Sequence, residues 1–141
     1  MEKSSRLVAG VVLVTVPTIA FGGMSLLWML KTTQPGYLDN PLRQDLFRAG
    51  HAHAGVWVIL ALVALLYVDR ARLSEGMRWL VRICLVTAPI LGPAGFFFSV
   101  LPPDATEPGP ALALVYVAAA ALAVGTVTLG VGLLRSAKER K

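Results

Sequence analysis

The segment 47–57, FRAGHAHAGVW, contains both histidines of the chain, His51 and His53. Imidazole is the commonest metal ligand among side chains and also transfers protons near neutral pH. A His-x-His pair first suggests a chelate for zinc or copper. Consecutive helix residues differ by about 100°, so on a helix the two rings point about 200° apart. We therefore expect the two histidines to have separate roles.

Small residues surround both histidines, and Gly50 and Gly55 are the smallest of them. A flat macrocycle needs such a bare helix surface beside an axial imidazole, and haem iron commonly takes one proximal histidine. Arg48, one turn before His51, is a candidate partner for a haem propionate. The residues alone leave open whether His51 or His53 is the ligand. The alternative is that both are interfacial histidines, hydrogen-bonded to water and lipid headgroups.

Four apolar runs must position these residues, at 7–30, 49–68, 79–101 and 111–134. A helix needs about 20 apolar residues to cross about 30 Å of hydrocarbon, and each run is close to that length. Hydrophobic residues make up 56% of the 141-residue chain, more than in ordinary soluble domains. We predict an all-α integral membrane protein, with residues 1–141 as a single domain of four transmembrane helices in a bundle.

Lysine and arginine gather in three segments, 2–6, 69–82 and 135–141. Four crossings place all three on one side, and the positive-inside rule makes that side the cytoplasm. We expect a multi-pass protein of the bacterial plasma (inner) membrane, with the N- and C-termini cytoplasmic. The net charge of +5 is explained by these helix ends. Because the charges form no stripe, we expect no nucleic-acid partner.

The third apolar run contains Pro89, Gly92, Pro93 and Gly95. Proline removes a helical hydrogen bond, so we expect the helix to be interrupted here, with a simple packing kink as the alternative. Irregular backbone at membrane depth requires cover from protein or a cavity. No Asp or Glu falls inside the four runs, which argues against a carboxylate proton relay.

Four short motifs occur in order along the chain. PGY (35–37) follows FGG and LWM at the end of the first run, and AHAG (52–55) contains His53. GPAGFFFS (92–99) ends the third run, and PGP (108–110) precedes the fourth. In their order, spacing and four-helix frame these motifs resemble the styrene oxide isomerase family of small haem-containing membrane enzymes. The resemblance covers most of the chain.

That resemblance implies a four-helix bundle assembled as a homotrimer, with haem b between neighbouring subunits. His53 occupies the histidine position of the family motif Ala-His-Ser-Gly, which implies that it is the axial ligand of the haem iron. The implied reaction is the Meinwald rearrangement of an aryl epoxide to an aldehyde. Ferric iron acts as a Lewis acid on the epoxide oxygen, in a dry apolar pocket. The implied substrate is a small apolar molecule.

Two positions depart from the family pattern, because Ile59 and Phe97 stand where the family has an Asn and a Tyr that help to hold substrate. We expect an apolar pocket between the outer halves of the second, third and fourth helices. Its candidate lining residues are Trp57, Ile59, Phe97 and Tyr116. Besides a haem-dependent epoxide isomerase, two functions stay open. One is a non-enzymatic haem protein, such as a sensor, a carrier or an electron-transfer subunit. The other is a cofactor-free accessory membrane subunit.

Overall fold

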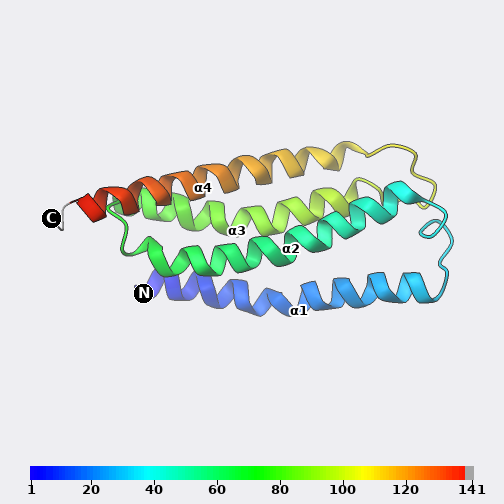
Figure 1. Ribbon diagram of the computed structural model, residues 1–141, viewed down its shortest axis with the longest axis horizontal. Coiled ribbons are helices and arrows are strands. Elements are labelled where there is room, and N and C mark those ends of the chain that lie inside the picture. The colour runs from blue at the N-terminus through cyan, green and yellow to red at the C-terminus, as the bar shows by residue number, and fades with distance from the viewer. Residues whose placement is uncertain (139–141) are drawn as a thin grey trace.

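A computed structural model describes residues 1–138, which fold into four long helices and one short one (Figure 1). The elements are α1 (Lys3–Lys31), α2 (Pro41–Val68), α3 (Glu75–Phe98), the 3-10 helix η1 (Pro110–Leu112) and α4 (Ala113–Lys138). The four long helices, the last counted together with η1, are each long and apolar enough to cross a membrane. No strand occurs in residues 1–138, so the predicted all-α class is confirmed for them. The end of the predicted domain and of its last basic segment, 139–141, lies outside the described residues.

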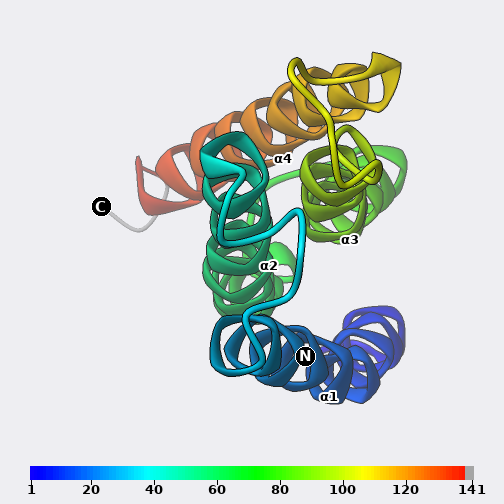
Figure 2. The same ribbon diagram turned by 90° about the vertical axis from the view of Figure 1, so that its right-hand side faces the viewer.

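The helices run alternately in opposite directions, so α1 begins where α4 ends (Figure 1). We call this end, which also holds the connection 69–74, the terminal end. The connections 32–40 and 99–109 lie at the other end, the loop end. α3 packs against both α2 and α4, whereas α1 lies mainly along α2 (Figure 2). Few α1 residues are buried, namely Ser5, Val12 and Leu26, so α1 is the peripheral helix of the bundle.

α2 begins at Pro41, well before the predicted start near residue 49. The side chain of Asn40 accepts a hydrogen bond from the Arg43 backbone N–H at 3.1 Å, which caps the helix. Pro41 stands in the first turn, where its missing N–H has no helical partner to lose. Hydropathy detects only the apolar part of a helix, and it therefore missed the polar first turns of α2.

α3 runs without interruption from Glu75 to Phe98, so the predicted break is wrong. Pro89 and Pro93 both lie inside the helix and are buried. The neighbouring helices pack closely on this segment. A Cβ atom at Gly95 would lie 2.8 Å from the Val115 side chain of α4. Close packing of small residues between helices supports the backbone that the prolines leave one hydrogen bond short.

Two apolar cores hold the bundle together. The larger one, at the terminal end, joins α2, α3 and α4 through Ala61, Ala64, Leu65, Val68, Ala71, Val81, Leu85 and Leu129. A Cβ atom at Gly125 of α4 would lie 2.9 Å from Cβ of Cys84. The small residues of α4 therefore permit the close helix approach expected of them. The smaller core, at the loop end, consists of Leu26, Tyr37, Phe47 and Val100.

Candidate functional site

His53 lies on the side of α2 that faces α3. Its Nδ1 atom is 2.7 Å from the carbonyl oxygen of Ala49, and its ring lies 5.0 Å, between centroids, from both Trp57 and Phe96. A carbonyl oxygen can only accept, so in the neutral ring Nδ1 carries the proton and Nε2 presents a lone pair. No atom of the described residues hydrogen-bonds to Nε2. Metal-ligating histidines have this arrangement, in which the second nitrogen donates to a carbonyl or carboxylate.

The two glycines beside the histidines have different surroundings. Gly50 is buried, and a Cβ atom there would lie 3.1 Å from the Phe97 ring and 3.2 Å from Cβ of Phe96. Gly50 therefore allows α2 and α3 to pack closely. A Cβ atom at Gly55 would have no neighbour within 4 Å. Gly55 alone of the two leaves bare, open helix surface.

His51 points to the opposite side of α2, against α1. A Cβ atom at Gly23 of α1 would lie 2.9 Å from both Cε1 and Nε2 of the His51 ring, so only glycine lets the ring rest on α1 there. His53 instead contacts Phe96 of α3. The predicted divergence of the two rings is confirmed. The ring nitrogens of His51 make no hydrogen bond with the part of the chain that the structure describes.

An apolar cavity of about 410 Å³ lies between α1, α2 and α3, beside His51. Its lining includes Thr15, Gly22, His51, Val58, Pro93 and Phe97. The expected pocket between the second, third and fourth helices is not where this cavity lies. The cavity lies on the α1 side because α1 packs along α2 but only weakly on α3, which leaves space between α1 and α3. Hydropathy does not encode this tertiary arrangement.

The four candidate pocket residues do not line one cavity within a single chain. Trp57 packs over Gly92 of α3, where any Cβ atom would overlap its ring. Ile59 is 64% exposed on α2, and Tyr116 is 70% exposed on α4. Tyr116 borders a shallow hollow formed with the connection to α4. Of the four, only Phe97 reaches the cavity beside His51.

Arg48 is exposed on the first half of α2. Its Nη2 donates to Oε1 of Gln44, one turn earlier, at 2.9 Å. This contact turns the guanidinium toward the loop end, along the same helix as both histidines. Its place beside a propionate stays a prediction.

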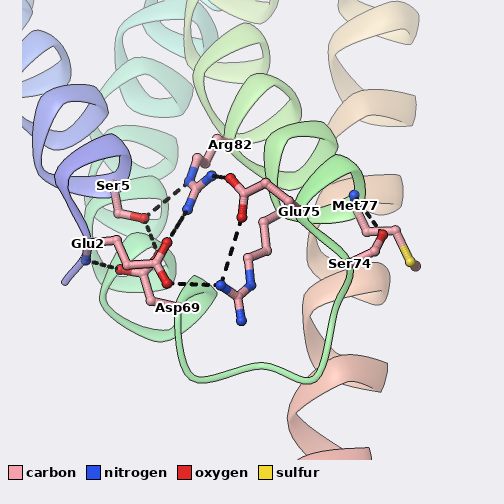
Figure 3. Close-up of polar contacts among 8 residues, drawn as sticks. Glu2, Ser5, Asp69, Ser74, Glu75, Met77 and Arg82 are labelled. Carbon is pink, nitrogen blue, oxygen red and sulfur yellow. Dashed lines mark hydrogen bonds and ion pairs between the residues drawn. The ribbon is translucent and has the colours of Figure 1, made fainter.

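A buried ion cluster lies at the terminal end, where the sequence predicts only basic helix ends (Figure 3). Arg82 is fully buried, and its guanidinium donates to Glu75 at 2.9 Å, to Asp69 at 3.0 Å and to the Ser5 hydroxyl at 3.1 Å. Arg78 adds an ion pair. Hydropathy and charge alone predict Arg82 only as a cation flanking a membrane helix. The available signal was the spacing of Glu75, Arg78 and Arg82, which places them on one helix face.

Asp69 links this cluster to the start of α1. Its carboxylate accepts hydrogen bonds from the Ser5 hydroxyl and the Glu2 backbone N–H, both at 2.6 Å. Burial raises the pKa of Asp69, but these hydrogen bonds and the Arg82 guanidinium outweigh burial and hold the pKa below its ordinary value. The ionised carboxylate therefore fastens the N-terminal end of α1 to the end of α2.

Arg43 plays a comparable part at the loop end, a role that hydropathy and charge do not reveal. It is buried, and its Nε donates to the Val100 carbonyl at 2.9 Å while Nη2 donates to the Leu101 carbonyl at 3.2 Å. Its Nη1 donates to the Gly36 carbonyl. One side chain of α2 thus satisfies carbonyls of both loop-end connections.

No group of three or more His, Cys, Asp or Glu side chains in residues 1–138 is arranged to hold a metal ion. Haem needs only one axial ligand from a chain, and His53 has the geometry for one. No family model, curated protein or solved structure matches the chain.

Proposed function

We propose that the chain is a haem b-binding membrane protein in which Nε2 of His53 is the axial ligand of the iron. The observation that carries the proposal is the 2.7 Å contact between Nδ1 of His53 and the Ala49 carbonyl. It fixes the tautomer in which Nε2 can bind a metal. The rings of Trp57 and Phe96 support the imidazole from two sides, so it enters a complex already oriented.

The surface beside His53 fits a porphyrin in chemistry. Val56 and Leu60 follow His53 by three and seven residues and so share its side of α2. They are large apolar side chains, 62% and 38% exposed. A single chain supplies only one wall to this surface. A second copy of the chain would supply the other, which supports the homotrimer with haem between subunits that the resemblance implies. Arg48 is the candidate cation for a propionate.

A bilayer accounts for the apolar exterior of the helices. Large apolar side chains are exposed on all four helices, among them Val14, Phe21, Ile83 and Val127. Exposure to water costs about 25 cal/mol for each Å² of apolar surface, whereas lipid imposes no such cost. The basic residues of 2–6, 69–82 and 135–138 share the terminal end (Figure 1). Under the positive-inside rule, the proposed orientation has the N- and C-termini in the cytoplasm of a bacterial cell, with the chain in the plasma membrane.

With haem bound, ferric iron would supply a Lewis acid for an epoxide oxygen, and the proposed activity is isomerisation of an apolar aryl epoxide to an aldehyde. The chain itself orients the imidazole through Ala49 and surrounds it with the apolar rings of Trp57 and Phe96. Ile59 and Phe97 offer no hydrogen-bond donor. Recognition of the substrate by this chain therefore rests on apolar contact.

A non-enzymatic haem protein is the second candidate. The observation that favours it is the scatter of Ile59, Phe97 and Tyr116, which form no common pocket beside His53. A sensor, a carrier or an electron-transfer subunit needs the iron ligand but no substrate pocket.

The first experiment is a titration of the purified full chain, in detergent, with hemin. The proposal predicts a Soret band that saturates at a fixed ratio of haem to chain. The ferric protein is then incubated with styrene oxide, and aldehyde formation supports the isomerase. Haem binding without aldehyde, combined with rapid reduction by a quinol, supports electron transfer instead. Absence of a Soret band would contradict both haem functions and favour the cofactor-free accessory subunit.

A further inference from the structure

The cavity beside His51 lies on the side of α2 that points away from His53, and the proposed haem does not use it. Its volume of about 410 Å³ falls within the range of small-molecule sites, about 300–1,000 Å³. His51 and Phe97 mark its end toward the loops, and Val11 marks its end toward the termini. An ionisable residue within a membrane-spanning segment indicates a functional site by default.

The polar groups of the cavity select the chemistry of a ligand. Within the described lining there is no Lys, Arg, Asp or Glu, so apart from the His51 imidazole no side chain there could act as a counter-ion for a buried charged ligand. The hydroxyls of Thr15 and Thr18 already donate to carbonyls of their own helix, at 2.7 Å and 2.6 Å. His51 alone has ring nitrogens without a partner in the described chain. The cavity therefore suits a ligand with one uncharged hydrogen-bonding group, placed at the His51 end.

A second apolar hollow extends the cavity toward the terminal end. Val11 and Val86 line both, and the second hollow continues to Leu7 and Trp79. At about 1.5 Å per helical residue, α1 advances about 22 Å between Leu7 and Gly22. Arg82 borders the far end, but its guanidinium is already paired with carboxylates. Apart from Arg82, the Thr87 hydroxyl and the indole N–H of Trp79, the described lining of the second hollow is apolar, so the two hollows together match a long apolar chain.

We propose that the α1–α3 side of the bundle binds an uncharged single-chain amphiphile, such as a long-chain alcohol. Its oxygen hydrogen-bonds to His51, and its chain runs between α1 and α3 toward Trp79. Two features favour this ligand over a bulk phospholipid: Arg82, the one charged side chain in the described lining of the two hollows, is already paired with carboxylates, and the same lining offers one unpartnered imidazole. The site is independent of the proposed haem, because His53 does not line the cavity and its ring instead contacts Phe96, on the side of α2 opposite to His51.

The test uses the full chain in phosphatidylcholine nanodiscs and a hexadecanol that carries a diazirine in its chain. After irradiation, mass spectrometry locates the labelled residues. The expected labels lie on α1 between Val11 and Gly22 and on α3 between Val86 and Phe97. Excess unlabelled hexadecanol removes them, and excess palmitate, which is charged, does not. Labels spread evenly over the four helices, or labels that hexadecanol fails to displace, would overturn the proposal.

Variants sharpen the test. Gly22→Leu fills the cavity and abolishes labelling, whereas Gly10→Leu, on the exposed side of the same helix, preserves it. Thr15→Leu fills the cavity away from His51, and its labelling is the test of the site if Gly22→Leu does not fold.

The histidine variants test the polar end of the site. His51→Phe weakens hexadecanol competition about three- to ten-fold, the effect of one neutral hydrogen bond. His53→Ala keeps the labels, so a failure of the haem proposal can be distinguished from a failure of the amphiphile site. Unchanged labelling in both cavity-filling variants contradicts the site.

Discussion

Nδ1 of His53 lies 2.7 Å from the carbonyl oxygen of Ala49, one helical turn earlier. A carbonyl has two lone pairs, so it can accept from the ring as well as from a helical N–H. The helix that carries the imidazole therefore also fixes its tautomer, without any polar residue from another helix. His51, two residues earlier, has no such partner in the described chain. The two histidines differ chemically as well as in direction.

Replacing Arg82 tests the ion cluster at the terminal end. Arg82→Met leaves the buried carboxylate of Asp69 without its guanidinium, and removal of one partner from a buried pair destabilises by about 3–5 kcal/mol. Unfolding in detergent, followed by circular dichroism, measures the loss. Arg6→Met, at an exposed position of α1, is the matched control and changes stability by less than about 0.5 kcal/mol. Equal losses in the two variants would show that the cluster contributes nothing.

Acid should loosen the same cluster through Asp69. The pKa of Asp69 is lowered in the folded chain, so ionised Asp69 stabilises the fold above its ordinary pKa of about 3.9. That contribution is lost as the pH falls through the lower, folded pKa. The midpoint of thermal unfolding, measured from pH 7 down to strongly acidic pH, should fall more in the wild type than in Asp69→Asn. Asp104→Asn, in an exposed connection, retains the wild-type acid response, and an identical response in Asp69→Asn would refute this role.

Gly92→Ala should separate α2 from α3 near the histidine. The new Cβ atom would overlap the ring of Trp57, and overpacking of this kind costs about 1–3 kcal/mol. Trp57 also supports the His53 ring, so haem affinity should fall together with the thermal midpoint. In Gly130→Ala, where the added Cβ atom has no neighbour within 4 Å, both quantities should stay the same or rise. A Gly92→Ala protein as stable as Gly130→Ala would mean that Trp57 is not packed as described.

Removing Arg43 should free both loop-end connections together. Arg43→Met deprives the carbonyls of Gly36, Val100 and Leu101 of their donor, and a hydrogen bond to a charged group contributes about 1.5–3 kcal/mol. Hydrogen exchange should become faster in 32–40 and 99–109, while the terminal end keeps its protection. Faster exchange in only one connection would limit the role of Arg43 to that side.

Periodicity and hydropathy predicted the features that depend on a single helix. The four long helices follow from apolar runs of membrane-spanning length, and the opposite directions of His51 and His53 follow from the helical repeat. The early start of α2 depends on a local cap at Asn40. The Asn-Pro pair that forms this cap can be recognised in the sequence, but it carries no hydropathy signal. The continuity of α3 through Pro89 and Pro93 depends on packing from α2 and α4, which no single-helix rule supplies.

The features that the sequence did not predict depend on residues far apart in the chain. Arg82 meets Ser5 and Asp69 across three elements, and a count of charges at helix ends cannot pair them. The cavity beside His51 exists because Gly22 and Gly23 bring α1 to that face of α2. In the sequence, these two glycines belong to the FGG motif at the end of the first apolar run, which does not predict that α1 packs against His51 there.

The most direct measurement of the central claim is the Soret spectrum of three hemin-loaded proteins: wild type, His53→Gly and His51→Gly. If His53 is the axial ligand, His53→Gly loses the wild-type band, and added imidazole, occupying the vacated ligand position, restores it. His51→Gly, altered on the opposite face of the same helix, keeps the wild-type band. Retention of the wild-type band in His53→Gly without imidazole, or its loss in His51→Gly alone, would contradict the assignment of His53 as the iron ligand.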